Sequence, residues 1–277
     1  MTNKNIDEKV VRDFGKEWKA FNHQEIDDSR LQSSFNSYFS IFPFKDLPLG
    51  AKGFDMGCGS GRWAKFVSPL VGSLHCIDPS EVALNEAKSN LSHLSNCTFE
   101  CASSSFNSLE SASQDFGYSL GVLHHIPDTY KALESCADKL KSGAPFLLYL
   151  YYRFDNKPRW YAVLWKFSDF LRKLISRCPF VVKFFISQVL ALLIYWPFAR
   201  LAKLSEKLGK DVENFPLSDY RDKPFYMMRT DALDRFGTRL EQRFTKKEIE
   251  KMLLNAGFKD IQFSNTPPFW TAMAIKL

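Results

Sequence analysis

Short apolar segments alternate with amphipathic ones between residues 50 and 152. The apolar segments are typical of buried strands, at 52–57, 73–78, 97–101, 115–123 and 145–152. The segments between them carry apolar residues at helical spacing, at 62–70, 80–91 and 129–140. Strands and helices in this regular alternation predict a parallel sheet with helices on both faces.

The alternation stops for about ninety residues, over 153–243, and then resumes. Thr245 and Glu248 predict a capping box at the start of a helix, and Gly257 predicts its end. Two strand-like segments close the chain, at 259–265 and 270–277. The complete pattern predicts an α/β fold: a Rossmann-like, seven-stranded, mostly parallel sheet with helices on both faces and a helical insert.

The same pattern divides the chain into four parts. We expect an N-terminal helical segment (1–45), a ligand-binding core (46–152), a helical insert (153–243) and the closing helix and strands of the core (244–277). In the N-terminal segment, residues 5–21 predict one or two short helices interrupted by Gly15.

Three glycines follow the first strand at alternate positions: Gly57, Gly59 and Gly61. A dinucleotide-binding loop has its last glycine where this chain has Arg62, and a P-loop ends in a Gly-Lys-Ser/Thr sequence that is absent here. A tight strand-to-helix turn without a ligand is the alternative. The glycines alone therefore do not identify what the loop approaches.

Two aspartates near this loop narrow the choice of ligand. Asp78 ends the second strand, where a carboxylate accepts hydrogen bonds from ribose hydroxyls. Asp55 lies on the first strand, where it would repel a pyrophosphate and suit a positive charge. Glycines let the backbone come close to an uncharged ribose or an amino-acid group. The pattern favours a cationic nucleoside with an amino-acid tail, such as S-adenosylmethionine.

Three ordered motifs carry a family resemblance. The sequences FDMGCGSG (54–61), HCIDPS (75–80) and LGVLHHIPD (120–128) together resemble the class I S-adenosylmethionine-dependent methyltransferases, closest to the branch that acts on small molecules. The resemblance covers about residues 50–152 and 244–277. It implies S-adenosylmethionine as cofactor and an N-terminal lid, with Phe14 and Trp18 folding over that cofactor. Packing of this segment on the sheet edge is the alternative.

The resemblance also implies a role for each matching residue. Asp55 would lie near the sulfonium and amino-acid end, and Asp78 would hold the ribose. Where the family usually has an acid for the adenine amino group, this chain has Ala102 or Ser103, which is a departure. The complete set of expected cofactor-binding residues is Asp55, Gly57, Cys58, Gly59, Gly61, Asp78, Pro79, Ser103, Leu120 and Gly121.

Methyl transfer to an oxygen acceptor needs alignment and a base. His124 and His125 follow the fourth strand, at the edge of the sheet where such folds bind ligands. We expect His125 to be the base or to orient the acceptor. The alternative is that one His caps the next helix while the other packs beside the cofactor. Asp128 is expected to cap that helix.

The insert is basic and apolar. Residues 153–210 hold twelve Lys and Arg and three acids, a net charge of +9 in a chain of net charge +6. Its longest charge-free run, 184–199, has sixteen residues and contains a proline that is expected to end the helix. A spanning helix needs about twenty residues, so we expect none. Two alternatives remain: a buried cap, packed on the core or on a second copy, or an element lying on a membrane surface.

Composition adds three expectations. No pair of cysteines has C-x-x-C spacing, so no metal site and only reduced thiols are expected. The first residues are polar and show no signal-peptide pattern, which favours a cytoplasmic protein, with peripheral contact at the inner membrane surface as an addition. The apolar insert is poorly suited to phosphates, so no nucleic-acid partner is expected.

The sequence gives less information about the methyl acceptor than about the cofactor. The stretch 225–245 has a low-specificity resemblance to methyltransferases of surface-polysaccharide pathways. It offers polar side chains for a sugar: Tyr226, Arg229, Asp231, Asp234 and Arg239. Solvated ion pairs on a helix are the alternative for this set. We expect a small or lipid-linked acceptor, preferably a sugar hydroxyl. A polyprenyl quinone or another lipid is an alternative, and so is a non-catalytic ligand-binding protein of the same fold.

Overall fold

The computed structural model describes residues 5–20 and 28–277, except for the side chains of residues 17–20, 28 and 30. The chain forms two compact units. The sheet unit comprises residues 1–153 and 240–277, and the helical unit comprises Phe154–Arg239. The predicted insert, 153–243, extends a few residues beyond the helical unit, mainly at its carboxyl end.

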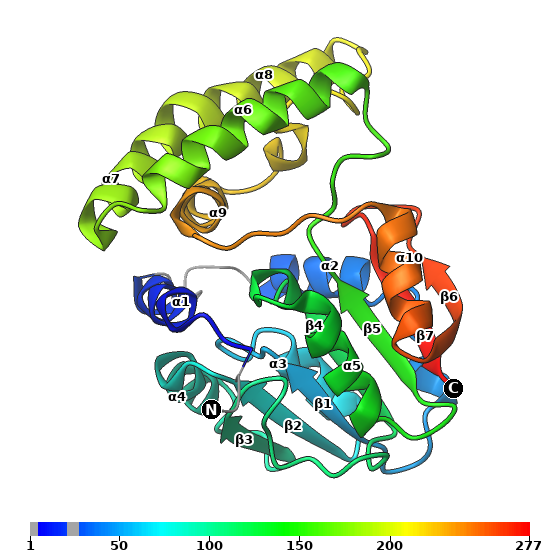
Figure 1. Ribbon diagram of the computed structural model, residues 1–277. Coiled ribbons are helices and arrows are strands. Elements are labelled where there is room, and N and C mark those ends of the chain that lie inside the picture. Colours follow the sequence, from blue (N-terminus) through cyan, green and yellow to red (C-terminus); the bar gives the residue numbers. More distant parts are fainter. Residues whose placement is uncertain (1–4, 21–27) are drawn as a thin grey trace. The chain divides into compact units, whose positions relative to one another are not determined.

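Seven strands form one sheet in the order β3-β2-β1-β4-β5-β7-β6 (Figure 1). Their bounds are β1 Lys52–Met56, β2 Ser73–Asp78, β3 Cys97–Cys101, β4 Phe116–Leu120, β5 Pro145–Tyr149, β6 Phe258–Phe263 and β7 Thr271–Lys276. Six strands run in the same direction, and β7, between β5 and β6, runs in the opposite direction. The prediction of a Rossmann-like, mostly parallel sheet with a helical insert is confirmed.

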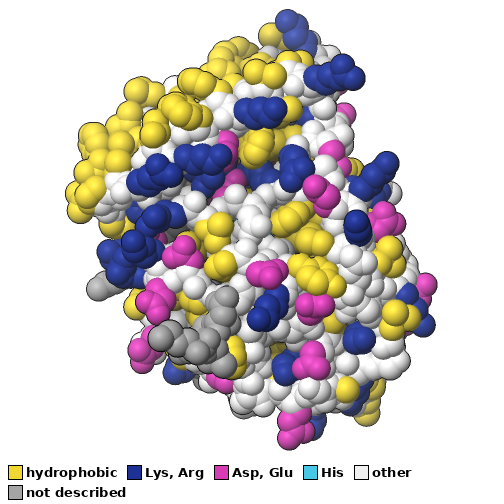
Figure 2. All heavy atoms as spheres, in the orientation of Figure 1, with side chains coloured by type: hydrophobic (Ala, Val, Ile, Leu, Met, Phe, Trp, Pro, Cys, Tyr) yellow, Lys and Arg dark blue, Asp and Glu magenta, His cyan; other side chains and the backbone are white. Residues whose placement is uncertain are grey.

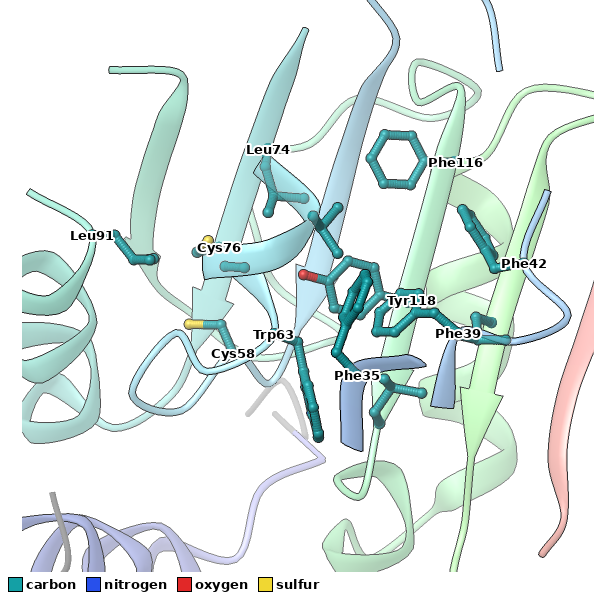
Figure 3. Close-up of a cluster of buried hydrophobic side chains, with 14 of the residues drawn as sticks. Phe35, Phe39, Phe42, Cys58, Trp63, Leu74, Cys76, Leu91, Phe116 and Tyr118 are labelled. Atoms are coloured by element: carbon teal, nitrogen blue, oxygen red, sulfur yellow. The ribbon is translucent and has the colours of Figure 1, made fainter. Parts of the chain in front are cut away.

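Helices pack on both faces of the sheet. One face is covered by α2 (Asp28–Tyr38), α3 (Ala64–Val67) and α4 (Glu81–Asn90), and the other by α5 (Thr129–Lys139) and α10 (Lys246–Asn255). Successive strand residues point to opposite faces, and β2, β5 and β7 contribute apolar side chains to the cores on both faces. In β4, Tyr118 packs on the first face, where Figure 3 shows it beside Phe35 and Phe39.

The helix starts in the sheet unit follow the local sequence. The Ser80 hydroxyl accepts the Ala83 N–H at the start of α4, and Asp128 accepts the Lys131 N–H at the start of α5. Thr245 and Glu248 form the predicted capping box of α10. Each side chain satisfies a backbone donor that has no partner within its helix. The predicted capping role of Asp128 is therefore confirmed.

The N-terminal helix differs from its prediction. A single helix, α1 (Glu8–Ala20), continues through Gly15 without interruption. A Cβ atom on Gly15 would lie 2.9 Å from the Ser80 hydroxyl oxygen. The glycine therefore allows α1 to approach the start of α4 closely, and it does not break the helix.

The helical unit holds four α-helices within its described residues: α6 (Arg159–Ile175), α7 (Phe180–Leu190), α8 (Trp196–Lys207) and α9 (Phe225–Gly237). Both α6 and α7 contact α9. A small core joins Ala191, Tyr195 and Ala199 to Met228 and Ala232 of α9. The two alanines let the α9 side chains come close.

The expectation that a proline ends the apolar helix is wrong. A π-helical turn at Ala191–Tyr195 joins α7 to α8, and Pro197 lies in the first turn of α8. A π turn changes the hydrogen-bond spacing, so the missing proline N–H does not stop the chain from staying helical. Phe180–Lys207 is thus one helix of 28 residues, long and apolar enough to cross a membrane by length and composition, and 22% of its most apolar stretch is buried.

Candidate active site

A cavity lies at the carboxyl ends of the central strands of the sheet unit. Its volume is about 810 Å³, including the solvent at its mouth. The lining comes from the ends of β1 and β2, from the segments after β3 and β4, and from α1 and the residues just before it. Ligands of open parallel sheets bind at this edge, because loops from several strands meet there.

The glycine loop forms one wall of the cavity. Gly57 has a φ of 85°, and a Cβ atom on it would lie 2.4 Å from the Val122 side chain. Gly57 and Gly59 both line the cavity, whereas Gly61 does not. A Cβ atom on Gly61 would meet Leu91 at 2.6 Å, so this third glycine serves packing of the loop on the neighbouring helix.

Asp78 connects this loop to the end of β2. Its carboxylate accepts the Gly59 N–H at 2.9 Å and the Ser80 N–H at 2.8 Å, and the residue lines the cavity. Burial raises the pKa of Asp78 to about 6, although the two backbone hydrogen bonds oppose the rise. The side chain is thus held in place and becomes ionised near neutral pH. It is suited to accept hydrogen bonds from a pair of ligand hydroxyls.

Asp55 lies behind the cavity wall. Its side chain is buried and is not part of the lining, and one carboxyl oxygen has no hydrogen-bond partner among the described residues. Burial raises the pKa of Asp55 to about 8, against the opposing effect of the neighbouring Tyr118 hydroxyl. A carboxyl group with an unused oxygen in this position fits a nearby positive charge, which would favour its ionised form.

The segment after β3 replaces the expected acid with small residues. Ala102, Ser103 and Ser104 all line the cavity. The Ser103 hydroxyl accepts the Phe106 N–H, whereas the buried Ser104 hydroxyl has no partner among the described residues. Ser104 thus places a hydroxyl without a described partner next to Ala102 and Ser103, the positions where the resemblance implies an adenine contact.

The two histidines have different surroundings. His125 lines the cavity, and its Nδ1 lies 2.7 Å from the Leu240 carbonyl oxygen. A carbonyl only accepts, so Nδ1 carries the proton in this bond and Nε2 of the neutral ring is left as an acceptor. A ring held in this tautomer can take a proton from a ligand.

His124 is packed rather than exposed to the cavity. Its ring is fully buried, lies 3.9 Å from the Tyr151 ring, and has no hydrogen bond to either nitrogen among the described residues. Burial lowers the pKa of His124 well below its ordinary value, and His125 and Arg243 add to this. A neutral ring stacked on Tyr151 supports the position of its neighbour, a role that neither of the expected alternatives described.

The segment that re-enters the sheet unit after the helical unit holds this turn in place. Besides the Leu240 carbonyl, the Gln242 amide donates to the Ile126 carbonyl at 2.8 Å, and the Gln242 N–H donates to the His124 carbonyl at 3.0 Å. Sequence reasoning did not find Leu240 or Gln242. Both form hydrogen bonds with residues more than a hundred positions away in the sequence. The role of a backbone carbonyl cannot be predicted from the residue type.

The start of α1 closes another side of the cavity. Asn5, Val10 and Phe14 line it, and the Phe14 ring lies 4.9 Å from the His125 ring. The Asn5 side chain donates to the Asp128 carbonyl and accepts the Asp128 N–H. The Trp18 side chain and residues 21–27, also part of the predicted lid, lie outside the described residues. Asn5, which ties the two segments together, was not predicted.

The structure brings most of the expected cofactor residues to one cavity. Its lining includes Gly57, Gly59, Asp78, Pro79, Ser103, Gly121 and His125. Besides Asp55 and His124, three expected residues lie outside the lining. They are Cys58, Gly61 and Leu120, which are packed in the protein.

The polar side chains proposed for an acceptor belong to the helical unit. Arg229 donates to the Gln188 side chain, and Asp234 accepts from Thr238. Asp231 adjoins Tyr220 and helps to raise its pKa, after burial. These contacts stabilise the helical unit around α9, and a role in acceptor binding stays a prediction.

Comparison with known proteins agrees with this geometry. Residues 54–148 match the methyltransferase domain family. A match over 103 residues, which covers 35% of the chain, is 30% identical to the tRNA (carboxymethyluridine(34)-5-O)-methyltransferase of Schizosaccharomyces pombe. It covers 39% of that protein. The chain thus spans about two fifths of the length of that relative.

Two solved structures share the fold over most of the chain. An S-adenosylmethionine-dependent methyltransferase of Thermotoga maritima matches 97% of this chain and 100% of its own, with a TM-score of 0.51 and 13% identity. One from Methanosarcina mazei matches 84% of this chain and 95% of its own, with a TM-score of 0.50 and 18% identity. At these identities the likeness concerns the fold.

Proposed function

We propose that the chain, whose residues 54–148 match the methyltransferase domain family, is an S-adenosylmethionine-dependent methyltransferase that transfers a methyl group to a hydroxyl of a small or lipid-linked acceptor. The preferred acceptor is a sugar hydroxyl in surface-glycan biosynthesis. The observation that carries the proposal is one cavity that combines the glycine loop, the fixed carboxylate of Asp78 and His125, whose Nδ1 is held by the Leu240 carbonyl.

The lining of this cavity fits the proposed cofactor. Asp78 would accept hydrogen bonds from the two ribose hydroxyls, and Ser104 would lie near the adenine edge. The apolar side chains of Ile77, Val122 and Ile126 would flank a planar base. The Asp55 carboxyl, behind the wall, would offset the positive charge of the ligand.

In the proposed mechanism the protein aligns the reactants and moves one proton. When bound, the cofactor supplies a methyl group on a sulfonium, already activated for displacement. His125 accepts the proton of the acceptor hydroxyl at Nε2, while its Nδ1–H stays bonded to the Leu240 carbonyl. His124 and Gln242 hold the turn, and Phe14 excludes water from the His125 ring.

A nucleic-acid acceptor is the second candidate, because the Schizosaccharomyces pombe relative is named as a tRNA methyltransferase. The sheet unit, which holds the cavity, has a net charge of −1, with 21 Lys and Arg against 22 Asp and Glu, and is poorly suited to phosphates. The basic residues of the chain are concentrated in the helical unit, with a net charge of +7. A polyprenyl quinone and a non-catalytic role also remain as alternatives.

The acceptor class can be tested with S-adenosylmethionine labelled in its methyl group. The protein is incubated with cell extract that is then separated into water-soluble metabolites, lipids and RNA. Label in a glycan or glycan-bearing lipid supports the proposal. Label in RNA, removed by ribonuclease, would replace it with the second candidate. Label in a sugar-free lipid would select the quinone or another lipid, and no label in any fraction would favour the non-catalytic role.

A further inference from the structure

The two longest helices of the helical unit expose their apolar sides. On α6, Val163 and Phe167 are 69% and 62% exposed, and Phe170 continues the same face one turn later. Along the 28-residue helix Phe180–Lys207, Phe185 and Leu193 are 67% and 65% exposed. Spacings of three, four and eight residues place these side chains along one side of each helix. Figure 2 shows hydrophobic side chains gathered over these helices.

The opposite sides of the same helices carry buried cations. Arg172 of α6 is 3% exposed and donates to the Thr238 carbonyl at 2.9 Å. Lys183 of α7 is 2% exposed and donates to the Gly237 carbonyl at 2.9 Å. Both cations thus bind the last carbonyls of α9, where a helix has unpaired acceptors and a partial negative charge.

This arrangement is the reverse of that in a water-soluble helical unit. Two cations, Arg172 and Lys183, point inward to hydrogen-bond acceptors, while large apolar side chains point outward. A contiguous apolar surface of this kind is larger than soluble monomers usually expose, so it needs a cover.

Charge around the apolar face indicates which cover it takes. Exposed Lys166, Lys173 and Arg177 lie on or just after α6, and exposed Lys207 and Lys210 lie at the end of the long helix. The whole helical unit has sixteen Lys and Arg against nine Asp and Glu, a net charge of +7. A second copy would bring an equally basic rim, and the two would repel. An anionic lipid surface would attract it.

We infer that the apolar face of α6 and Phe180–Lys207 lies on an anionic membrane surface, with the two helices in the plane of the interface. The long helix does not cross the bilayer. Its other side packs on α9 through Ala191, Ala199 and buried Lys183, so that side is not available to lipid. Apolar side chains enter the headgroup boundary, and the surrounding cations contact the anionic headgroups.

Docking of this kind narrows the acceptor to one carried by a lipid, at the inner surface of the membrane. This second step rests on the proposed function, whereas docking does not. Membrane binding and methyl transfer can therefore fail separately in experiments.

The test is sedimentation of the full chain with vesicles of phosphatidylcholine, alone or mixed with phosphatidylglycerol. We expect the protein to pellet with the mixed vesicles at low salt and to be released by high salt. The double variant Phe167→Gln, Phe185→Gln should bind the vesicles about tenfold or more weakly, because burial of two phenyl rings is lost. The matched control Leu49→Gln, Leu70→Gln changes two exposed leucines of the sheet unit and should bind like the wild type.

Circular dichroism and calorimetry with S-adenosylmethionine show whether each variant is folded and whether the proposed function holds independently of docking. Protein that stays in the supernatant with both kinds of vesicle would overturn the inference. If light scattering then finds a dimer that Phe167→Gln, Phe185→Gln converts to monomer, a second copy covers the face instead.

Discussion

At the scale of single residues, backbone groups determine what the site can do. The Gly59 and Ser80 N–H groups fix the carboxylate of Asp78, and the Leu240 carbonyl fixes the tautomer of His125. Each side chain is held in one geometry by backbone partners, which is how positioned acids and bases act.

Cofactor affinity should depend on pH through Asp78. The pKa of this carboxyl is raised to about 6 by burial, and hydrogen bonds from ribose hydroxyls favour its ionised form. Protonation of Asp78 should therefore make affinity fall by up to about tenfold per pH unit below about pH 6. Calorimetric titrations across this range measure it. An affinity that does not change between about pH 5 and about pH 7 would exclude Asp78 as a ligand.

His125→Asn separates catalysis from binding. The asparagine amide can still donate to the Leu240 carbonyl, but it cannot accept a proton as Nε2 does. Turnover on the acceptor should fall about a hundredfold or more, while the cofactor dissociation constant should change less than about threefold. Rate and binding measurements on one preparation test this. Full turnover in the variant would mean that the acceptor needs no base from His125.

At the scale of elements, the sequence predicted what local patterns encode. Alternating apolar segments located every strand of the sheet, and Ser80, Asp128 and Thr245 marked three helix starts. Two local rules failed because tertiary packing overrode them. Gly15 serves close packing on Ser80, and a π turn carries the long helix through Pro197.

The site was predictable only where it follows the strands. The glycine loop, Asp78 and the His turn come directly after strand ends, so their convergence follows from parallel topology. Asn5, Leu240 and Gln242 reach the site from distant parts of the chain. Each of their hydrogen bonds involves a backbone group, whose role cannot be predicted from the residue type. Only the folded structure shows that these groups lie together.

Asn5 should control the first part of α1. Its side chain exchanges two hydrogen bonds with the backbone of Asp128, one in each direction. In Asn5→Ala, amide hydrogen exchange over residues 8–16 should become faster, and cofactor affinity should fall by roughly threefold to tenfold, about 1 kcal/mol. The exposed Glu8→Gln serves as control. Unchanged exchange in Asn5→Ala would show that α1 is held by its other contacts alone.

At the scale of the whole molecule, ionisation behind the site should reduce stability. Burial raises the pKa of Asp55 to about 8, well above its ordinary value, so the folded protein binds this proton more tightly than the unfolded chain does. The contribution of the protonated Asp55 to the free energy of unfolding is therefore fully present at low pH. It is lost as the pH rises towards about 8, by at most about 1.4 kcal/mol per pH unit. A carboxyl placed in this way is unfavourable for the fold, and we propose that it serves to balance the charge of a bound ligand.

Asp55→Asn should make stability less dependent on pH. Urea unfolding of the variant and the wild type at about pH 5 and about pH 8 gives the comparison. The difference in unfolding free energy between the two pH values should shrink in the variant, because the titrating group is gone. An equal difference in both proteins would show that Asp55 does not titrate in this range.

The central claim is that the cavity of the sheet unit binds S-adenosylmethionine through Asp78. Isothermal titration calorimetry with the wild type, Asp78→Asn and the control Asp115→Asn tests it most directly. Asp115 also accepts a backbone N–H, that of Lys52, at the amino end of the strands. We predict binding by the wild type and by Asp115→Asn, and binding weaker by about 1.5–3 kcal/mol in Asp78→Asn, the range for hydrogen bonds to a charged group. Absence of binding by the wild type, or equal affinity in all three proteins, would contradict the account.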